Sequence, residues 1–277
     1  MKKSLIITIL LFLCAGMTFA QKDSITVISF NIRYNNPGDG DNIWDNRKAS
    51  CVNMAKMERP DFLCVQEAYF VQLDYLRQKL EGYDYIGVGR DDGKQGGEHM
   101  AILYRKDRFE LIQHGDFWLS ETPDVCSRGW DAVCHRIVTW GYFKDLRTGQ
   151  NIYCFNTHLD HVGVTARRES VKLITARIKE IATDKKAPIF LTGDFNSDIE
   201  SEIFKPLKKI MKQARENAPV TDHYGTFNGW GNAPNNIVID HIFYNNATPI
   251  LFQTLNTDKY GRWLISDHYP IKCVFVR

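Results

Sequence analysis

The chain has 277 residues, of which 44% are hydrophobic, with 35 basic and 33 acidic side chains. This near balance of charge does not favour non-specific binding to long nucleic acids, which relies on a basic excess. The apolar content is enough for a sizeable core, and no repeat and no long Pro, Gly or Ser tract divides the chain. A single domain is therefore predicted.

The first 20 residues have the three parts of a secretory signal peptide. Two lysines precede an apolar stretch from Leu5 to Cys14, and Thr18-Phe19-Ala20 follows. The stretch is shorter than the about 20 apolar residues that span a bilayer, so no stable membrane insertion is expected. We predict cleavage after Ala20, export to the periplasm or outside the cell, and a mature domain over residues 21–277 without formal net charge. Lipidation of Cys14 is an alternative that the bulky Leu13 disfavours.

Six short apolar runs each end in acids, amides or histidines. They cover residues 27–30, 62–65, 152–155, 189–192, 237–239 and 264–265. Short apolar runs bounded by polar residues are typical of buried strands, and functional groups concentrate on the loops that a sheet positions. The pattern predicts one site built from many strand ends.

Other segments show helical or strand periodicity. Helices are predicted over residues 45–58, through Val71, Leu73, Leu76 and Leu80, and over residues 170–182. Strands are predicted over residues 98–105, 136–144 and 272–276. Mixed strands and helices indicate an α/β fold with helices covering the sheet faces, in one sheet or two.

The cysteines fall into two groups. Cys64, Cys154 and Cys273 lie in strand-like runs, where a cysteine usually serves as a small core residue. Cys126 and Cys134 flank a loop and could close a short disulfide, although spacing alone does not give the required geometry. No Cys/His spacing indicates zinc.

The polar groups after the apolar runs share one chemistry. They are Glu67, Asp160, Asp194, Asp240, Asp267, His158, His268, Asn31, Asn156 and Asn196. Such an oxygen-rich set suits a hard divalent ion, with Mg²⁺ expected and Mn²⁺ as an alternative, whereas zinc would favour more histidine or cysteine. The predicted chemistry is metal-assisted hydrolysis of a phosphate ester.

Six motifs in order resemble those of the endonuclease/exonuclease/phosphatase superfamily. They are Phe30-Asn31-Ile32-Arg33, Gln66-Glu67, Asn156-Thr157-His158-Leu159, Gly193-Asp194-Phe195-Asn196, Ile239-Asp240-His241-Ile242-Phe243 and Ser266-Asp267-His268-Tyr269-Pro270. The resemblance implies a four-layer α/β sandwich in which two mostly antiparallel β-sheets are flanked by helices, with the site at one edge.

The resemblance also implies a metal site. Glu67 resembles the principal magnesium ligand, with Asn31 beside it and Asp267 near enough to assist directly or through water. A cation held there neutralises phosphate oxygens and the leaving oxygen.

The resemblance assigns the remaining groups to water and phosphate. Asp194 orients, and in one interpretation deprotonates, the attacking water, while Asn196 donates to a phosphoryl oxygen. His268 contacts the scissile phosphate, and Asp240 accepts its other ring proton. Whether His268 or Asp194 is the general base stays open. The same resemblance makes His158 a second phosphate donor oriented by Glu98, and places Arg136 and Asn156 at the substrate phosphate.

Two aromatic-containing loops are candidates for substrate contact. They are residues 117–134, with Trp118 and Trp130, and residues 224–236, with Phe227 and Trp230. Such rings stack on bases or accept apolar groups, or they pack inward and close the rim of the sandwich.

The leading hypothesis is a nuclease-type phosphodiesterase acting on nucleic acid or oligonucleotides, without an obligate protein partner. The alternatives are a lipid or sugar phosphate hydrolase of the sphingomyelinase or inositol phosphatase type, and a non-catalytic binding module on the same fold.

Overall fold

The computed structural model describes residues 24–276, so the predicted leader lies outside the described residues. In this part of the chain no helix is both long enough and apolar enough to cross a membrane.

Two six-stranded sheets form the centre of the fold. The first has the order β11 (Thr248–Thr254), β12 (Ile271–Val276), β1 (Ile25–Asn31), β2 (Phe62–Gln66), β4 (Ile102–Arg105), β3 (Tyr83–Ile86). The second has the order β5 (Phe109–Trp118), β6 (Ile137–Asp145), β7 (Asn151–His158), β8 (Ile189–Asp194), β10 (Asp240–Asn245), β9 (Lys212–Gln213). Among these twelve strands of the described chain, only β1 with β2 and β7 with β8 pair in parallel, so the predicted mostly antiparallel sandwich is confirmed.

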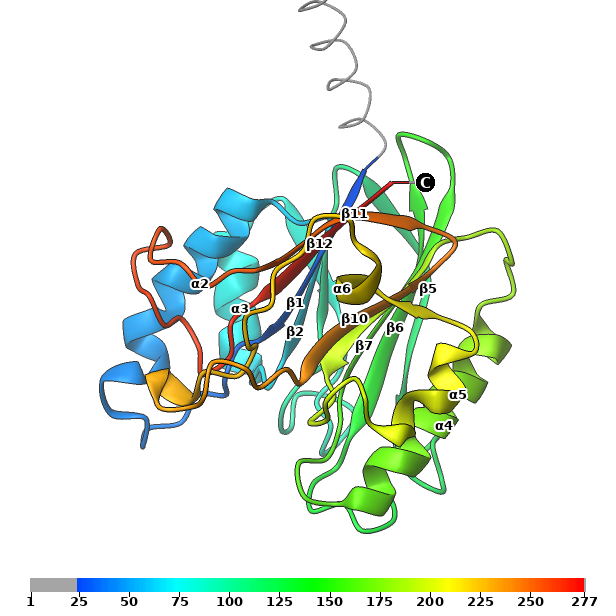
Figure 1. Ribbon diagram of the computed structural model, residues 1–277, viewed down its shortest axis with the longest axis horizontal. Helices are drawn as coiled ribbons and strands as arrows, with labels where there is room; N and C mark the ends of the chain where they lie inside the picture. Colours follow the sequence, from blue (N-terminus) through cyan, green and yellow to red (C-terminus); the bar gives the residue numbers. More distant parts are fainter. Residues whose placement is uncertain (1–23, 277) are drawn as a thin grey trace, which may run out of the picture.

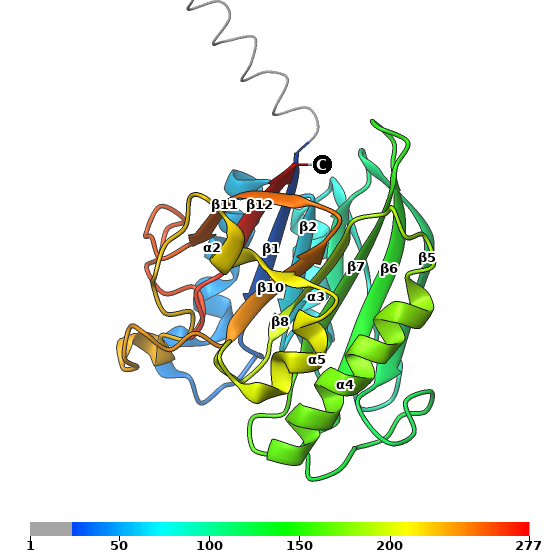
Figure 2. The ribbon, with the colours of Figure 1, turned by 45° about the vertical axis from the view of Figure 1, so that its right-hand side comes forward.

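Helices cover the outer face of each sheet (Figure 1). Against the first sheet lie α2 (Trp44–Glu58) and α3 (Phe70–Lys79), and against the second lie α4 (Val164–Ile181) and α5 (Lys205–Lys208). Figure 2 shows α4 and α5 in front of the second sheet. The shorter elements are α6 (Ala214–Asn217), η1 (Gly40–Asn42), η2 (Glu202–Phe204) and η3 (Gly229–Gly231). The result is a sandwich of four layers.

The alternation of side chains along each strand divides the core into layers. In β1, Val27 packs between the sheets, whereas Ile28 and Phe30 pack against the helices. In β7, Cys154 faces the other sheet and Phe155 faces α4. Because strand side chains alternate with a period of two, strands such as β1, β2, β7 and β8 contribute to both an inter-sheet and a sheet-to-helix cluster.

The inter-sheet layer becomes polar at one end. Continuing the same alternation, Asn31 ends β1 and Asp194 ends β8 on the inner faces of their sheets. One step further into the core, Gln66 Nε2 donates to Asn156 Oδ1 across 2.7 Å and joins the two sheets. The fold therefore opens a buried polar site at the end of its central layer.

Two of the six apolar runs do not form strands. Residues 237–239 are irregular, and β10 begins at Asp240, so this carboxylate starts a strand rather than following one. Residues 264–265 are likewise irregular, and β12 begins only at Ile271. Because β10 runs antiparallel to β8, and β12 to β1, the starts of these strands meet the ends of their neighbours. Both motifs therefore lie at the predicted edge, although each precedes a strand instead of following one.

Several element boundaries also differ from the sequence prediction. The helix predicted from residue 170 begins at Val164, and the strand predicted from residue 98 begins at Ile102. Strands β3, β5 and β11 were not predicted. All six described cysteines are free, so the disulfide weighed between Cys126 and Cys134 does not form. Cys64, Cys154 and Cys273 are core residues, as predicted.

Candidate active site

Strand register places three predicted groups side by side. Asp194 lies opposite His158 on one side and opposite Asp240 on the other. From the first sheet, Asn31 Nδ2 donates to Asp194 Oδ2 across 3.0 Å. All four side chains are buried, so the site is assembled at the junction of both sheets.

Glu67 is held beside Asn31. The Asn31 amide donates to Glu67 Oε1 at 2.9 Å, and the Tyr34 backbone N–H donates to Glu67 Oε2 at 3.2 Å. Glu67 has a φ of 61°, a left-handed conformation that non-glycine residues rarely adopt. Such strain persists where the surrounding structure imposes it, often at functional sites.

Asp267 approaches from the segment before β12. Ser266 Oγ donates to the Asn31 carbonyl at 2.7 Å and also lies 3.2 Å from Asp267 Oδ1. Arg33 Nη1 lies 3.6 Å from Asp267 Oδ2 and ties this carboxylate to the loop after β1. The three residues predicted to hold metal, Glu67, Asn31 and Asp267, are thus brought to one region.

The donor chemistry fits a divalent cation. Ligand atoms of Glu67, His158 and Asp194 lie within 4.8 Å of one another, as do those of Asp194, Asp240 and His268. Burial, reinforced by the charge of Asp240, raises the pKa of Asp194 to about 7. Burial, with the charge of Glu67, likewise raises the pKa of Glu98 to about 7. Crowded buried carboxylates of this kind are stabilised in their ionised form by a bound cation. His158 enters this set although the sequence assigned it to phosphate.

His268 and Asp240 form a buried pair. His268 Nδ1 donates to Asp240 Oδ2 across 2.8 Å, which leaves Nε2 directed toward the carboxylate of Asp194 at 3.7 Å. Burial opposes the charged imidazole, but the charges of Asp240 and Asp194 outweigh it and raise the pKa of His268 to about 10. The pair can therefore present an imidazolium N–H to an anionic phosphate.

A tight turn after β8 presents Asp194 and Asn196 together. The Asn196 backbone N–H donates to Asp194 Oδ1 at 2.9 Å, and Asn196 has a left-handed φ of 47°. Its side-chain amide donates to His158 Nε2 at 3.1 Å. Before the turn, a Cβ on Gly193 would lie 2.4 Å from the Thr157 carbonyl, so only glycine lets β8 approach β7 this closely.

Glu98 lies near His158 without a hydrogen bond to it. The distance from His158 Nδ1 to Glu98 Oε2 is 3.9 Å, and the nearer partner of this carboxylate is Arg90, at 2.6 Å. Burial and the charges of Arg136 and Arg90 lower the pKa of His158 well below its ordinary value. A neutral His158 accepts from Asn196 at Nε2, which leaves its Nδ1 proton facing Glu98.

Arg136 and Asn156 occupy different depths. Arg136 is buried behind His158, with Nε 3.4 Å from Asp160 Oδ2 and Nη2 donating to His161, while Nη1 has no partner among residues 24–276. Asn156 is fully buried and is bonded to protein at both amide atoms. The structure therefore does not bring Asn156 to the substrate side, because it joins the two sheets beneath the site.

Three arginines near the site had no role assigned from the sequence. Arg90 pairs with Glu98, and Arg33 pairs with Asp267. Arg47 is buried in α2, and its guanidinium donates to the backbone carbonyls of Ile32 and Ile265, in the segments that carry Asn31 and Asp267. Only Arg33 lies in one of the motifs, and nothing in the sequence singles out the other two.

Neither tryptophan of the loop of residues 117–134 makes a hydrogen bond to the catalytic cluster, which comprises Glu67, His158, Asp194, Asp240 and His268. Trp118 is buried, and its indole N–H donates to the Arg90 carbonyl, so it closes the rim of the sandwich. Trp130 is half-buried, and its backbone N–H donates to Glu121. Phe227, in contrast, lies against His268 with ring centroids 5.0 Å apart.

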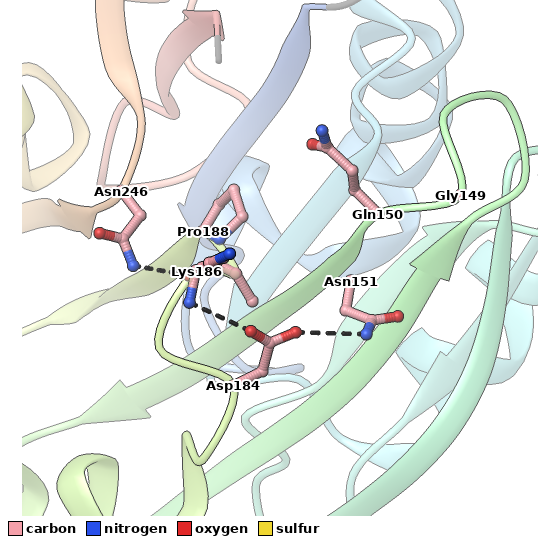
Figure 3. A pocket seen from close by; sticks show the side chains of 8 residues that line it. Gly149, Gln150, Asn151, Asp184, Lys186, Pro188 and Asn246 are labelled. Atoms are coloured by element: carbon pink, nitrogen blue, oxygen red, sulfur yellow. Dashed lines mark hydrogen bonds between the residues drawn. The ribbon is translucent and has the colours of Figure 1, made fainter.

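A polar hollow of about 440 Å³ lies at the opposite end of the second sheet (Figure 3). It is lined near the starts of β7 and β8, whereas His158 and Asp194 end those strands. Asp184 there accepts hydrogen bonds from Asn151 and from the Lys186 backbone. These groups satisfy one another and take no part in the catalytic cluster.

The site gathers carboxylates, amides and two histidines at one edge of a four-layer sandwich. This combination of fold and site is typical of phosphoester hydrolases. The chain belongs to the endonuclease/exonuclease/phosphatase family, whose model matches residues 28–268. The family resemblance inferred from the six motifs is thereby confirmed. Members of this family depend on metal ions, in keeping with the donor set described above.

Several bacterial structures are similar over nearly the whole chain. The mannosyl-6-phosphatase Bt3783 of Bacteroides thetaiotaomicron VPI-5482 is 39% identical, with a TM-score of 0.86, over 91% of this chain and 100% of that one. A family member from Bacteroides vulgatus is also 39% identical, with a TM-score of 0.86, over 92% and 99% of the two chains.

More distant relatives include viral and eukaryotic proteins. Protein L388 of Acanthamoeba polyphaga mimivirus is 26% identical over 84% of this chain and 92% of its own length. The Ccr4 exoribonuclease subunit of Debaryomyces hansenii is 24% identical over 68% of this chain, which spans only 26% of that protein.

Proposed function

We propose that this protein is a Mg²⁺-dependent phosphatase that removes phosphate from a phosphorylated sugar. The observation that carries the substrate class is the 39% identity to a mannosyl-6-phosphatase over its complete chain. Within the hypotheses drawn from the sequence, this is the sugar-phosphate alternative rather than the leading nuclease hypothesis.

Glu67, Asn31 and Asp267 would hold the cation, with Asp194 beside them. When bound, the cation neutralises phosphate oxygens and the leaving oxygen. Mg²⁺ is the expected ion, and Mn²⁺ the alternative, because oxygen donors dominate the set.

The chain's own residues position and activate the water. Asp194 accepts a proton of the attacking water and orients its lone pair toward phosphorus, and Asn196 donates to a phosphoryl oxygen. His268 donates its Nε2 proton to the phosphate, while Asp240 fixes the ring through Nδ1. These donors act where negative charge develops, so they lower the barrier for attack. The guanidinium of Arg136, near the neutral His158, supplies further positive charge.

A nuclease-type phosphodiesterase is the second candidate. It is favoured by the ring of Phe227 beside His268, because an aromatic ring next to the scissile phosphate can stack on a base. The relatives whose names describe nucleases are 24% identical or less, below the 39% of the phosphatase.

The two candidates are separated by a substrate panel. The mature protein is incubated with mannose 6-phosphate, glucose 6-phosphate, inositol polyphosphate, sphingomyelin, bis-p-nitrophenyl phosphate and single-stranded RNA and DNA, with Mg²⁺ or with EDTA. Mg²⁺-dependent phosphate release from a sugar phosphate, absent in Asp194→Asn, is the expected result. Cleavage of only the diesters or nucleic acids would transfer the assignment to the second candidate, and no cleavage at all would favour a binding module.

We also propose that the protein is exported after cleavage behind Ala20. The support is the charged, apolar and small-residue order of the first 20 residues. N-terminal sequencing of protein purified from the producing cells should begin at Gln21, whereas an intact Met1 terminus on cytoplasmic protein would refute export.

A further inference from the structure

A hollow of about 370 Å³ lies between the loop of residues 224–235 and the segment of residues 256–269. This volume falls within the range of about 300–1,000 Å³ that ligand pockets occupy. The side chains relevant to its chemistry are Tyr224, Phe227, Asn235, Asn256, Trp263 and Tyr269.

The hollow adjoins the catalytic centre through Phe227. This residue pairs with His268 in an isolated antiparallel bridge, and their rings pack edge to face with centroids 5.0 Å apart. The following residue, Asn228, donates its backbone N–H to the Asp267 carbonyl at 2.8 Å. Phe227 therefore both lines the hollow and contacts His268, so a single side chain separates the hollow from the catalytic centre.

The lining combines exposed aromatic faces with unused amides. Tyr224 is 53% exposed and Trp263 is 55% exposed, and Trp263 Nε1 donates to the Tyr269 hydroxyl at 3.3 Å, which fixes the two rings together. Within residues 24–276, the side-chain amides of Asn235 and Asn256 make no hydrogen bond. Aromatic faces pack against the C–H face of a sugar ring, and free amides bond its hydroxyl edge.

None of the described residues that line the hollow has a charged side chain. A bound oligonucleotide carries a phosphate at every step and is held by cations along its backbone. An uncharged ring with hydroxyl groups has no such requirement. The lining therefore favours a neutral sugar over the next nucleotide of a nucleic acid.

We infer that this hollow is a subsite for the uncharged sugar unit joined to the phosphorylated sugar, so that the enzyme acts on phosphorylated oligosaccharides. The inference rests on the proposed sugar-phosphatase function. It names Trp263 and Tyr224 as the stacking platform, and Asn235 and Asn256 as the hydroxyl partners.

Steady-state kinetics test the specificity. The value of kcat/KM is measured for mannobiose carrying a 6-phosphate on one sugar and for mannose 6-phosphate, and their ratio is compared between proteins. Wild type should prefer the disaccharide, and Trp263→Ala should lower the ratio about 10-fold, the scale of an anchor aromatic. Trp263→Phe, which keeps a stacking ring, should retain most of the preference. Tyr85→Ala, which truncates a half-buried aromatic on edge strand β3, is the matched control and should keep the wild-type ratio.

Calorimetric titration with unphosphorylated mannobiose separates this inference from the proposed function, because it requires no catalysis. Binding to wild type and its loss in Trp263→Ala would support the subsite even if no sugar phosphate were hydrolysed. Equal disaccharide preference in wild type and Trp263→Ala, or titration showing that AMP binds while mannobiose does not, would overturn it. Absence of phosphate release from both the phosphorylated mannobiose and mannose 6-phosphate would instead refute the proposed function alone.

Discussion

Replacing Asp240 with asparagine tests the pairing on which the role of His268 depends. Asp240 Oδ2 accepts from His268 Nδ1 at 2.8 Å, and both side chains are buried. The substitution keeps the shape and one acceptor but removes the charge that raises the pKa of His268. Asp240 Oδ1 has no hydrogen-bond partner within the described chain, so the new amide NH₂ at that position would also lack an acceptor.

The expected magnitude comes from the charge on this hydrogen bond. A hydrogen bond to a charged group contributes about 1.5–3 kcal/mol. Since about 1.4 kcal/mol corresponds to a factor of ten in rate, kcat should fall about 10- to 150-fold. The KM should change less, because the substrate phosphate still meets the cation and His158.

The assay is Mg²⁺-dependent release of phosphate from the best substrate of the panel, at saturating substrate, with circular dichroism as a check of folding. Asp184→Asn is the matched control, because it alters a carboxylate at the far end of the same sheet. A folded Asp240→Asn protein with kcat within twofold of wild type would refute the proposed function of the pair.

Three further predictions concern the metal site and stability. Glu67→Gln should raise the Mg²⁺ concentration needed for half-maximal activity by about tenfold or more, because a charged ligand is lost; an unchanged Mg²⁺ titration would remove it from the metal site. Arg108→Met should lower the free energy of unfolding by about 3–5 kcal/mol, because the buried carboxylates of Asp61 and Asp145 would lose the guanidinium that lies 2.8 and 3.0 Å from them. A shift in the guanidinium chloride midpoint equivalent to under 1 kcal/mol would contradict this. Burial opposes ionisation of Glu58, but hydrogen bonds from two lysines and a tyrosine outweigh it and lower its pKa to about 2. The stability advantage of wild type over Glu58→Gln should therefore be complete above about pH 4.5 and disappear as the pH falls to about 2, in denaturant titrations across that range; a constant difference would exclude the linkage.

Apolar patterning was the most reliable guide to the fold. The strands ending at Asn31, Gln66, His158 and Asp194 were predicted from short buried runs, because a strand covered on both faces must be apolar along its length. Patterning failed at edge strands such as β3, whose half-exposed residues show no such run. It also failed for the run before Asp240, because an irregular apolar run that precedes a strand has the same sequence pattern as a strand.

Within the site, motif residues and supporting residues differ in what the sequence reveals. Asp194, Asn196 and His268 could be proposed because their motifs stand next to recognisable strands. The pairing of Arg90 with Glu98, and the hydrogen bonds of Arg47 to two loops, could not be proposed, because no periodicity or motif points to these contacts.

The sequence by itself determined the class of fold, the chemical character of the site and the family, since these depend on local apolar runs and on the identity of polar residues beside them. The tertiary structure decided which groups meet. It buried Asn156 between the sheets, placed a ligand atom of His158 near those of Glu67 and Asp194, and joined the loop of Phe227 to the segment of Trp263 around one hollow. The reason is that antiparallel pairing and sheet-on-sheet packing bring together residues distant in sequence, and neither arrangement is encoded in any single segment.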